Sequence, residues 1–345
     1  MPPTSTYPYT PEQVTSAFTE ITATLFNGIK AETVPKMLIT AGSQGSGKTY
    51  LLENTLLPSR RYGNYVRLYL PEYREKHPRY AEMIKRGVLH AYEHTEAFVR
   101  EVSSKIFEEA FKRKYNIIME CAFDSIDFAA FPPMATAAGY QFETHIIACK
   151  KGFAHLSSIK RVLKSLEKQE MERFVSLSAL NASLGNAQAT ILAFETAAKA
   201  ISGSQIFLYE RGFGPLKDRI LRVQSTYTKD SDGTVVITGP KIVYASAFET
   251  IVNNRLHLIG DREEMAKECH LALLKTQAHA EHVPDSVYND LYAISSGTWL
   301  GSDLPGPVIS NAPAPSRTGS LHRFTPKLKG RGMMAARFVG APAHR

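Results

Sequence analysis

The sequence predicts an α/β protein in which helices cover both faces of a mostly parallel β-sheet, followed by a helical C-terminal extension and a disordered tail. Its 345 residues are 43% hydrophobic, which is enough to bury a full core. Five short apolar runs have the length and continuity of buried strands, and segments with helical periodicity separate them. The predicted strands are residues 37–41, 65–69, 116–121, 143–149 and 205–210.

The predicted helices alternate with these strands. The first has Thr10 as its N-cap and Pro11 as its first residue, runs to about Ile29, and is expected to pack on the sheet. Further helices are predicted to start at residue 50 and to span 91–113, 126–138, 152–169 and 187–200.

The pattern changes after the fifth strand. A Lys-Asp-Ser-Asp-Gly turn at 229–233 separates two strand-like pieces, 222–227 and 234–237. Helical patterns follow at 246–254, 261–280 and 287–294, and from Ser296 onward Gly, Pro and Ser replace any periodicity. We therefore divide the chain into a loose N-terminus (1–10), a core (11–215), a hairpin and helical extension (216–299) and a basic, disordered tail (300–345).

Composition argues against several classes of protein. The net charge is +8, but residues 311–345 hold seven Lys and Arg and no acidic residue, which leaves 34 basic and 33 acidic residues elsewhere. A nearly neutral body argues against a nucleic-acid substrate. We find no apolar run of membrane-spanning length and no signal-peptide pattern, so we expect a cytoplasmic protein. The cysteines lack metal-ligand spacing, and two of them, Cys121 and Cys149, lie in apolar runs as small core residues.

One motif indicates chemistry directly. Residues 42–49, Gly-Ser-Gln-Gly-Ser-Gly-Lys-Thr, match the phosphate-binding P-loop pattern and lie between a predicted strand and a predicted helix. The glycines let backbone N–H groups approach phosphate oxygens, Lys48 reaches the β- and γ-phosphates, and the Thr49 hydroxyl can ligate Mg²⁺. A glycine-rich turn that binds nothing rarely has this context. The sequence thus predicts a P-loop NTPase or kinase fold whose nucleotide contacts are Gly42, Ser43, Gln44, Gly45, Ser46, Gly47, Lys48 and Thr49.

Charged residues follow the ends of the second and third predicted strands, where parallel sheets bind ligands. Glu72, Arg74 and His77 follow the second strand; in isolation the first two are typical solvated charges and His77 a turn residue. Glu120 comes directly after Ile-Ile-Met and would be costly to bury unpaired, which favours a functional role. Asp124 follows it, and phosphoryl transfer needs such carboxylates for a general base and for Mg²⁺.

The order of these pieces resembles the zeta toxin family, a group of P-loop kinases. The resemblance covers roughly half of the chain, from about Met37 to Gly212. It rests on the P-loop, Arg-Glu-Lys-His-Pro-Arg-Tyr at 74–80, Ile-Met-Glu at 118–120, the segments 159–161 and 171–173, and Ile-Phe-Leu-Tyr-Glu-Arg-Gly at 206–212.

This resemblance implies an ATP- and Mg²⁺-dependent kinase. By position, Lys48 and Thr49 would hold the phosphates and Mg²⁺, and Glu120 would contact the substrate or position its hydroxyl. Arg161 and Arg173, which alone would be taken for surface residues on helices, would stabilise the transferring phosphoryl group. The family's best-known acceptor is the 3′-hydroxyl on the sugar of UDP-N-acetylglucosamine, and an effector branch phosphorylates NAD instead.

One departure from the family pattern concerns the general base. The family places an Asp three residues before the Arg of its Arg-x-x-His-Pro element, and this position is Pro71. We favour the adjacent Glu72 as the base, with Asp124 as an alternative. A third hypothesis is a degenerate ATP-binding protein that acts through a partner. The resemblance also implies an antitoxin or a chaperone-like inhibitor, and action in the producing bacterium or in a target cell. The residues after Gly212 are not explained by the family motifs, and we expect them to shape a different acceptor pocket.

Overall fold

A seven-stranded sheet organises the molecule. The computed structural model describes residues 7–216, 218–254 and 259–296. The strand order is β2-β3-β1-β4-β5-β6-β7, with parallel pairing from β2 to β5 and antiparallel pairing of β6 and β7. The strands are β1 (Lys36–Ala41), β2 (Tyr65–Arg67), β3 (Asn116–Cys121), β4 (Gln141–Cys149), β5 (Ser204–Arg211), β6 (Arg219–Lys229) and β7 (Val235–Thr238). The predicted mostly parallel sheet is confirmed.

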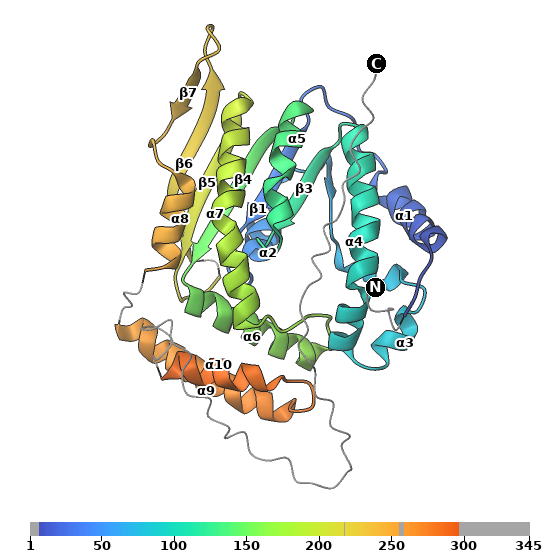
Figure 1. The fold of residues 1–345 in the computed structure, drawn as a ribbon, viewed down its shortest axis with the longest axis vertical. Helices are drawn as coiled ribbons and strands as arrows, with labels where there is room; N and C mark the ends of the chain where they lie inside the picture. Colours follow the sequence, from blue (N-terminus) through green and yellow to red (C-terminus); the bar gives the residue numbers. More distant parts are fainter. Residues whose placement is uncertain (1–6, 217, 255–258, 297–345) are drawn as a thin grey trace, which may run out of the picture.

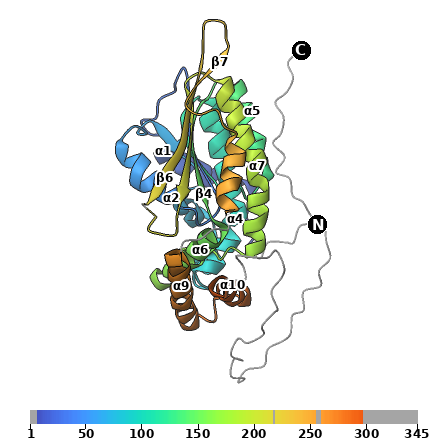
Figure 2. The same ribbon diagram turned by 90° about the vertical axis from the view of Figure 1, so that its left-hand side faces the viewer.

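Helices cover both faces of this sheet, as predicted (Figures 1 and 2). Along β1, Met37 and Ile39 belong to the main core, while Leu38 belongs to a smaller core on the opposite face. The alternation follows from the two-residue period of a strand. The main core lies under α4 (Val88–Lys112), α5 (Phe131–Ala137), α7 (Leu177–Ala200) and α8 (Tyr244–Val252). The opposite face is covered by α2 (Lys48–Leu51), the π-helix η1 (Leu52–Leu56) and the short helix η2 (Leu57–Ser59).

The N-terminal helix α1 (Pro11–Leu25) has the predicted start and a different packing partner. Thr10 and Gln13 form a capping box, which satisfies free N–H groups of the first turn. The helix ends at Leu25 rather than Ile29 and packs against α4 and η3 (Pro71–Lys76) instead of chiefly on the sheet. Residues 7–10 were expected to be loose, yet Tyr7 is buried and its hydroxyl lies 2.9 Å from His90 Nε2.

Two helices in the middle of the chain differ from their predicted bounds. The helix expected at 126–138 is a 3-10 turn, η4 (Ile126–Ala129), followed by α5, because Pro132 and Pro133 are favourable only at a helix start. The helix expected at 187–200 begins ten residues earlier as α7, with the Ser176 side chain as its N-cap. The remaining central helices are α3 (Tyr80–Ile84) and α6 (Lys151–Lys168).

The C-terminal region divides between two cores. The predicted hairpin is confirmed as β6 and β7, which continue the sheet, and α8 joins the main core. Helices α9 (Ile259–Ala278) and α10 (Asp285–Ser295) instead pack on α6 in a second core, at one end of the molecule (Figure 1). The predicted disordered tail, 300–345, lies outside the described residues. In the part of the chain that is described, no helix is long and apolar enough to cross a membrane, and all three cysteines are buried free thiols.

Candidate active site at the P-loop

The P-loop joins β1 to α2 and presses closely against α6. Gly45 has a φ of +77°, and a Cβ at this position would lie 1.9 Å from the carbonyl oxygen of Ala154. Gly47, with a φ of +94°, precedes the first residue of α2. L-residues are strained in this left-handed region, so the two glycines permit both the turn and the close approach to α6. The loop geometry predicted from the motif is therefore present.

Lys48 is held inside this loop. Its Nζ donates hydrogen bonds to the carbonyl oxygens of Gly42, at 2.8 Å, and Ser43, at 3.0 Å. Burial lowers the pKa of the ammonium group from 10.5 to about 8, and the Glu120 carboxylate opposes part of this shift. The carbonyl bonds fix the cation at the mouth of a loop whose backbone is shaped for phosphate.

Thr49 and Glu120 meet across two neighbouring strands. The Thr49 hydroxyl donates a 2.8 Å hydrogen bond to Glu120 Oε2, and Arg67 lies 3.4 Å from Oε1 of the same carboxylate. A hydroxyl beside a carboxylate suits Mg²⁺, which prefers oxygen ligands. Among the described residues, no group of three or more His, Cys, Asp or Glu could hold a metal ion. Mg²⁺ at this pair would thus take its other ligands from phosphates and water, as it does in nucleotide sites.

The two arginines implied by the resemblance lie near this pair, in different settings. Arg161 is on α6, and its Nε lies 2.8 Å from Glu172 Oε2. The positive charge of Arg161 also helps to lower the pKa of Lys48. Arg173 lies in the connection between α6 and α7 rather than on a helix as expected, and its Nη2 is 3.9 Å from Asp124 Oδ2. The negative charge of Asp124 in turn raises the pKa of Lys48. The structure therefore brings the P-loop lysine, both arginines and Asp124 to one edge of the sheet.

The segment after β2, which contains Glu72, Arg74 and His77, makes fewer contacts with the P-loop residues. Glu72 is exposed in the first turn of η3, and no hydrogen bond or ion pair joins it to any residue that the structure describes. Arg74 is buried and forms a 2.7 Å ion pair with Glu96 of α4, while His77 packs edge-on against Phe98. Arg74 and His77 thus hold η3 against α4. Glu72 as the base stays a prediction.

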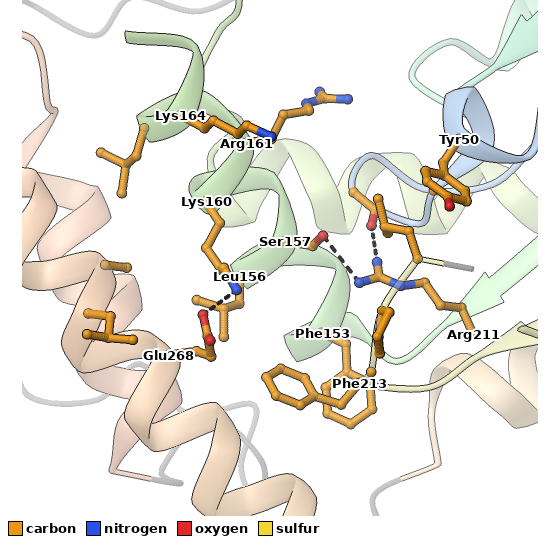
Figure 3. A pocket seen from close by; sticks show the side chains of 18 of the residues that line it. Tyr50, Phe153, Leu156, Ser157, Lys160, Arg161, Lys164, Arg211, Phe213 and Glu268 are labelled. Atoms are coloured by element: carbon orange, nitrogen blue, oxygen red, sulfur yellow. Dashed lines mark hydrogen bonds and ion pairs between the residues drawn. The ribbon is translucent and has the colours of Figure 1, made fainter. Parts of the chain in front are cut away.

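Arg211 is a site residue for which the sequence pattern predicted no role. This buried side chain donates from Nη1 to the Gly45 carbonyl oxygen and from Nη2 to the Ser157 hydroxyl, the latter at 3.3 Å (Figure 3). It therefore ties the P-loop to α6. Arg211 is the last residue of β5, so the strand-end rule already applied to β2 and β3 would have found it.

A cavity of about 920 Å³ extends from the P-loop along α6. Gly45, Lys48 and Thr49 line it on one side. Figure 3 shows α9 on the opposite side, with α6 between them. Phe153 and Phe213, whose ring centroids are 5.1 Å apart, also line the cavity. Three cations of α6 also line the cavity: Lys160, Arg161 and Lys164.

The chain is similar to known proteins in family and in fold. The model of the zeta toxin family matches residues 22–236. A solved structure from the PezAT chromosomal toxin–antitoxin system of Streptococcus pneumoniae has a TM-score of 0.54 at 16% identity, over 79% of this chain and 98% of that one. The AvrRxo1-ORF1:ORF2 complex with ATP has a TM-score of 0.45 at 12% identity, over 82% of this chain and 86% of that one. No curated protein matches the chain.

Proposed function

The chain belongs to the zeta toxin family and is a phosphotransferase of the kinase type, and from this premise we propose that it transfers the γ-phosphate of Mg-ATP to a sugar hydroxyl of a small nucleotide-type acceptor. The observation that carries the proposal is the arrangement of Lys48, Thr49 and Glu120. The buried ammonium of the P-loop lies beside a hydroxyl–carboxylate pair that joins Thr49 of the P-loop to Glu120 of β3, and phosphoryl transfer requires groups of these types.

The proposed roles follow from these positions. Lys48 binds the β- and γ-phosphates, and Thr49 and Glu120 hold Mg²⁺, which when bound neutralises charge on the phosphate oxygens. Arg161 and Arg173 stabilise the negative charge that spreads over the transferring group. Both side chains are partly exposed, at 46% and 36%, and their present carboxylate partners leave them able to turn toward a phosphate. The remaining P-loop residues, Gly42 to Gly47, contact the nucleotide through their backbone N–H groups.

For the general base, the geometry favours Asp124 over Glu72. Asp124 follows β3, raises the pKa of Lys48 through its negative charge, and lies 3.9 Å from Arg173. Glu72 is exposed on η3 and pairs with none of these groups. A base must reach the acceptor hydroxyl beside the γ-phosphate, and Asp124 stands among the residues that would surround that phosphate.

The first acceptor that we propose is UDP-N-acetylglucosamine, and the second is NAD, because the family resemblance implies both. ATP and both acceptors are cytoplasmic metabolites, so the proposed reaction would take place in a cytoplasm. The name of the PezAT system pairs a toxin with an antitoxin, and we propose that a neutralising protein partner also exists for this chain.

The test is an acceptor panel. Purified protein is incubated with Mg-ATP, UDP-N-acetylglucosamine and NAD together, and products are read by mass spectrometry with Lys48→Ala as the control. We expect a new phosphate on one acceptor with the wild type and none with Lys48→Ala. ATP binding without product on either acceptor would instead favour a degenerate nucleotide-binding protein that acts through a partner.

A further inference from the structure

Arg173 lies in a segment without regular secondary structure. Residues 170–176, between α6 and α7, are neither helical nor extended in a strand. The 3.9 Å contact of Arg173 with Asp124 is longer than a hydrogen bond and leaves the guanidinium group loosely held on that side. Because an arginine side chain has many rotamers, its position here depends on contacts with neighbouring elements.

Tyr92, in the second turn of α4, supplies such a contact. The guanidinium carbon of Arg173 lies over the Tyr92 ring, 5.5 Å from the ring centroid. The connection that carries Arg173 passes the start of α4 and also meets α3, where the Tyr80 hydroxyl is 3.8 Å from Met171 Sδ (Figure 1). Tyr92 is half-buried and belongs to none of the hydrophobic clusters of the described residues. Its ring thus lies between α4 and the connection rather than in a core.

Arg74 fixes the ring of Tyr92. Its guanidinium carbon lies over the same ring, 3.8 Å from the centroid. Nη1 of the buried Arg74 donates to the Tyr92 carbonyl oxygen at 3.1 Å and to the Thr95 hydroxyl at 3.0 Å, and Nη2 forms the 2.7 Å ion pair with Glu96. A planar group bonded at three points sets the orientation of the ring stacked on it. Through Tyr92, the Arg of the Arg-x-x-His-Pro element is therefore linked to Arg173.

An aromatic ring is suited to hold a cation whose charge is needed elsewhere. The face of the ring attracts a guanidinium group through its quadrupole. Burial raises the pKa of Tyr92 above its usual value of 10, so the ring is a neutral phenol. A carboxylate in the same place would also attract Arg173, but its negative charge would cancel part of the positive potential that a phosphoryl group meets. Tyr92 therefore holds the cation without neutralising it.

We propose that Tyr92 is a positioning residue, which holds the guanidinium group of Arg173 in place for the transferring phosphoryl group while Arg74 fixes the ring. The inference rests on the proposed function, in which Arg173 stabilises the charge of that group. It assigns a role to a residue outside the motifs that carry the family resemblance. Because Arg173 would act on charge that develops in the transition state, loss of Tyr92 should lower kcat and leave the KM for Mg-ATP little changed.

The test measures kcat and KM on the full chain, with the acceptor that the panel identifies. Tyr92→Phe keeps the aromatic face and should retain kcat within about twofold, whereas Tyr92→Leu should lower kcat about tenfold with a KM for Mg-ATP within about twofold of wild type. Phe26→Leu is the matched control. Arg113 lies over the half-buried ring of Phe26, 5.6 Å from its centroid, and Phe26 packs against Tyr115, where β3 begins. This variant should leave kcat unchanged.

Trifluorophenylalanine at position 92 is a second variant, which preserves the shape of the side chain. Fluorine withdraws electron density from the ring and weakens its attraction for a cation, while the ring still packs as phenylalanine does. We expect kcat to be about fivefold lower than in Tyr92→Phe. In an Arg173→Gln background, Tyr92→Leu should lower kcat no further, because Tyr92 acts through Arg173.

Equal kcat with phenylalanine and with trifluorophenylalanine at position 92 would overturn this inference. A further loss from Tyr92→Leu in the Arg173→Gln background would also overturn it, as would an equal loss in Phe26→Leu, because Tyr92 would then have only a structural role. If the wild type phosphorylates neither acceptor, or if Arg173→Gln keeps the full kcat, the proposed function fails and this inference fails with it. If Arg173→Gln lowers kcat and Tyr92→Leu does not, the inference about Tyr92 alone fails.

Discussion

The Thr49 hydroxyl donates a 2.8 Å hydrogen bond to Oε2 of Glu120, so the first helical turn after the P-loop is tied to the end of β3. The sheet makes this contact possible. β1 and β3 are adjacent parallel strands with Ala41 opposite Cys121, and both strands deliver their chains to the same edge. Two residues 71 positions apart in sequence therefore form one polar unit beside the buried Lys48.

We expect Glu120→Gln to impair use of Mg²⁺. The amide oxygen can still accept the Thr49 hydrogen bond, but the negative charge is lost, so the metal is held more weakly. The predicted effect is a fall in kcat/KM of about 100-fold together with a higher Mg²⁺ requirement. Initial rates of phosphate transfer over a Mg²⁺ series would measure both.

Glu53→Gln is the matched control for this prediction. Glu53 also pairs with Arg67, at 2.9 Å, but its side chain is 48% exposed and is not bonded to Thr49. Its loss should leave the Mg²⁺ requirement unchanged. If Glu53→Gln and Glu120→Gln raised that requirement equally, the effect would belong to Arg67 and not to the Thr49–Glu120 pair.

The affinity for ATP should depend on pH through Lys48. Burial lowers its pKa to about 8 in the free protein. The bound triphosphate favours the charged ammonium, so the pKa is higher in the complex. Affinity is therefore constant below pH 8 with respect to Lys48, and falls above it at a rate approaching tenfold per pH unit until the pKa of the complex is reached. Calorimetry at pH 7 and pH 9 would measure the change, and Lys48→Met should lack it. A Lys48→Met protein with the wild-type slope would assign the pH dependence to other groups.

Much of the fold and of the P-loop half of the site could be predicted because both depend on local sequence. The strands are continuous apolar runs, and the P-loop is one contiguous motif with its strand and helix on either side. The position of Glu120 beside the P-loop also requires β3 to pair with β1, and local sequence does not determine this pairing. Moreover, the helix after the P-loop is an α-turn that opens into a π-helix at Leu52–Leu56, which no periodicity in the sequence indicates.

The rest depends on packing between segments that are far apart in the sequence. Arg211 reaches Gly45 across 166 positions, and α9 meets the P-loop cavity only because α9 and α10 share a core with α6. Helical periodicity shows that α1 has an apolar face and does not show that α4 covers it. The position of Arg173 in a connection, where it can reach Asp124, was likewise hidden by the helix-like residues around it.

Gly45→Ala should disable the P-loop, because a Cβ there would lie 1.9 Å from the Ala154 carbonyl oxygen and the φ of +77° is unfavourable for alanine. The loop would have to move away from α6. We expect at least a tenfold loss of ATP affinity, measured by calorimetry. The free energy of unfolding should fall by about 1–3 kcal/mol, the usual cost of a strained backbone position, and the Tm should fall with it.

Gly185→Ala provides the contrast, since Gly185 lies in α7 with open space around its Cβ position. This substitution should stabilise the protein by about 0.5–1 kcal/mol and leave ATP affinity unchanged. Wild-type affinity in Gly45→Ala would mean that the P-loop does not press against α6.

The last prediction separates the two candidate bases. Asp124→Asn removes a carboxylate that stands near Lys48 and Arg173, and should lower kcat by about 10²–10⁴-fold while ATP binding stays close to the wild type. Glu72→Gln removes an exposed carboxylate and should leave kcat within about twofold, as surface substitutions away from a site usually do. Initial rates with the acceptor identified by the panel, together with calorimetric ATP affinities, would measure both effects.

Arg173→Gln controls for the ion pair, because Asp124→Asn also frees Arg173. If Asp124 served only to position Arg173, then Asp124→Asn in the Arg173→Gln background would cost nothing further, whereas a base would still be missed. A large loss of kcat in Glu72→Gln, with activity retained in Asp124→Asn, would return the base to the residue that follows Pro71. The base would then follow the same strand as in the family, but it would be a glutamate one position after the place of the family's Asp.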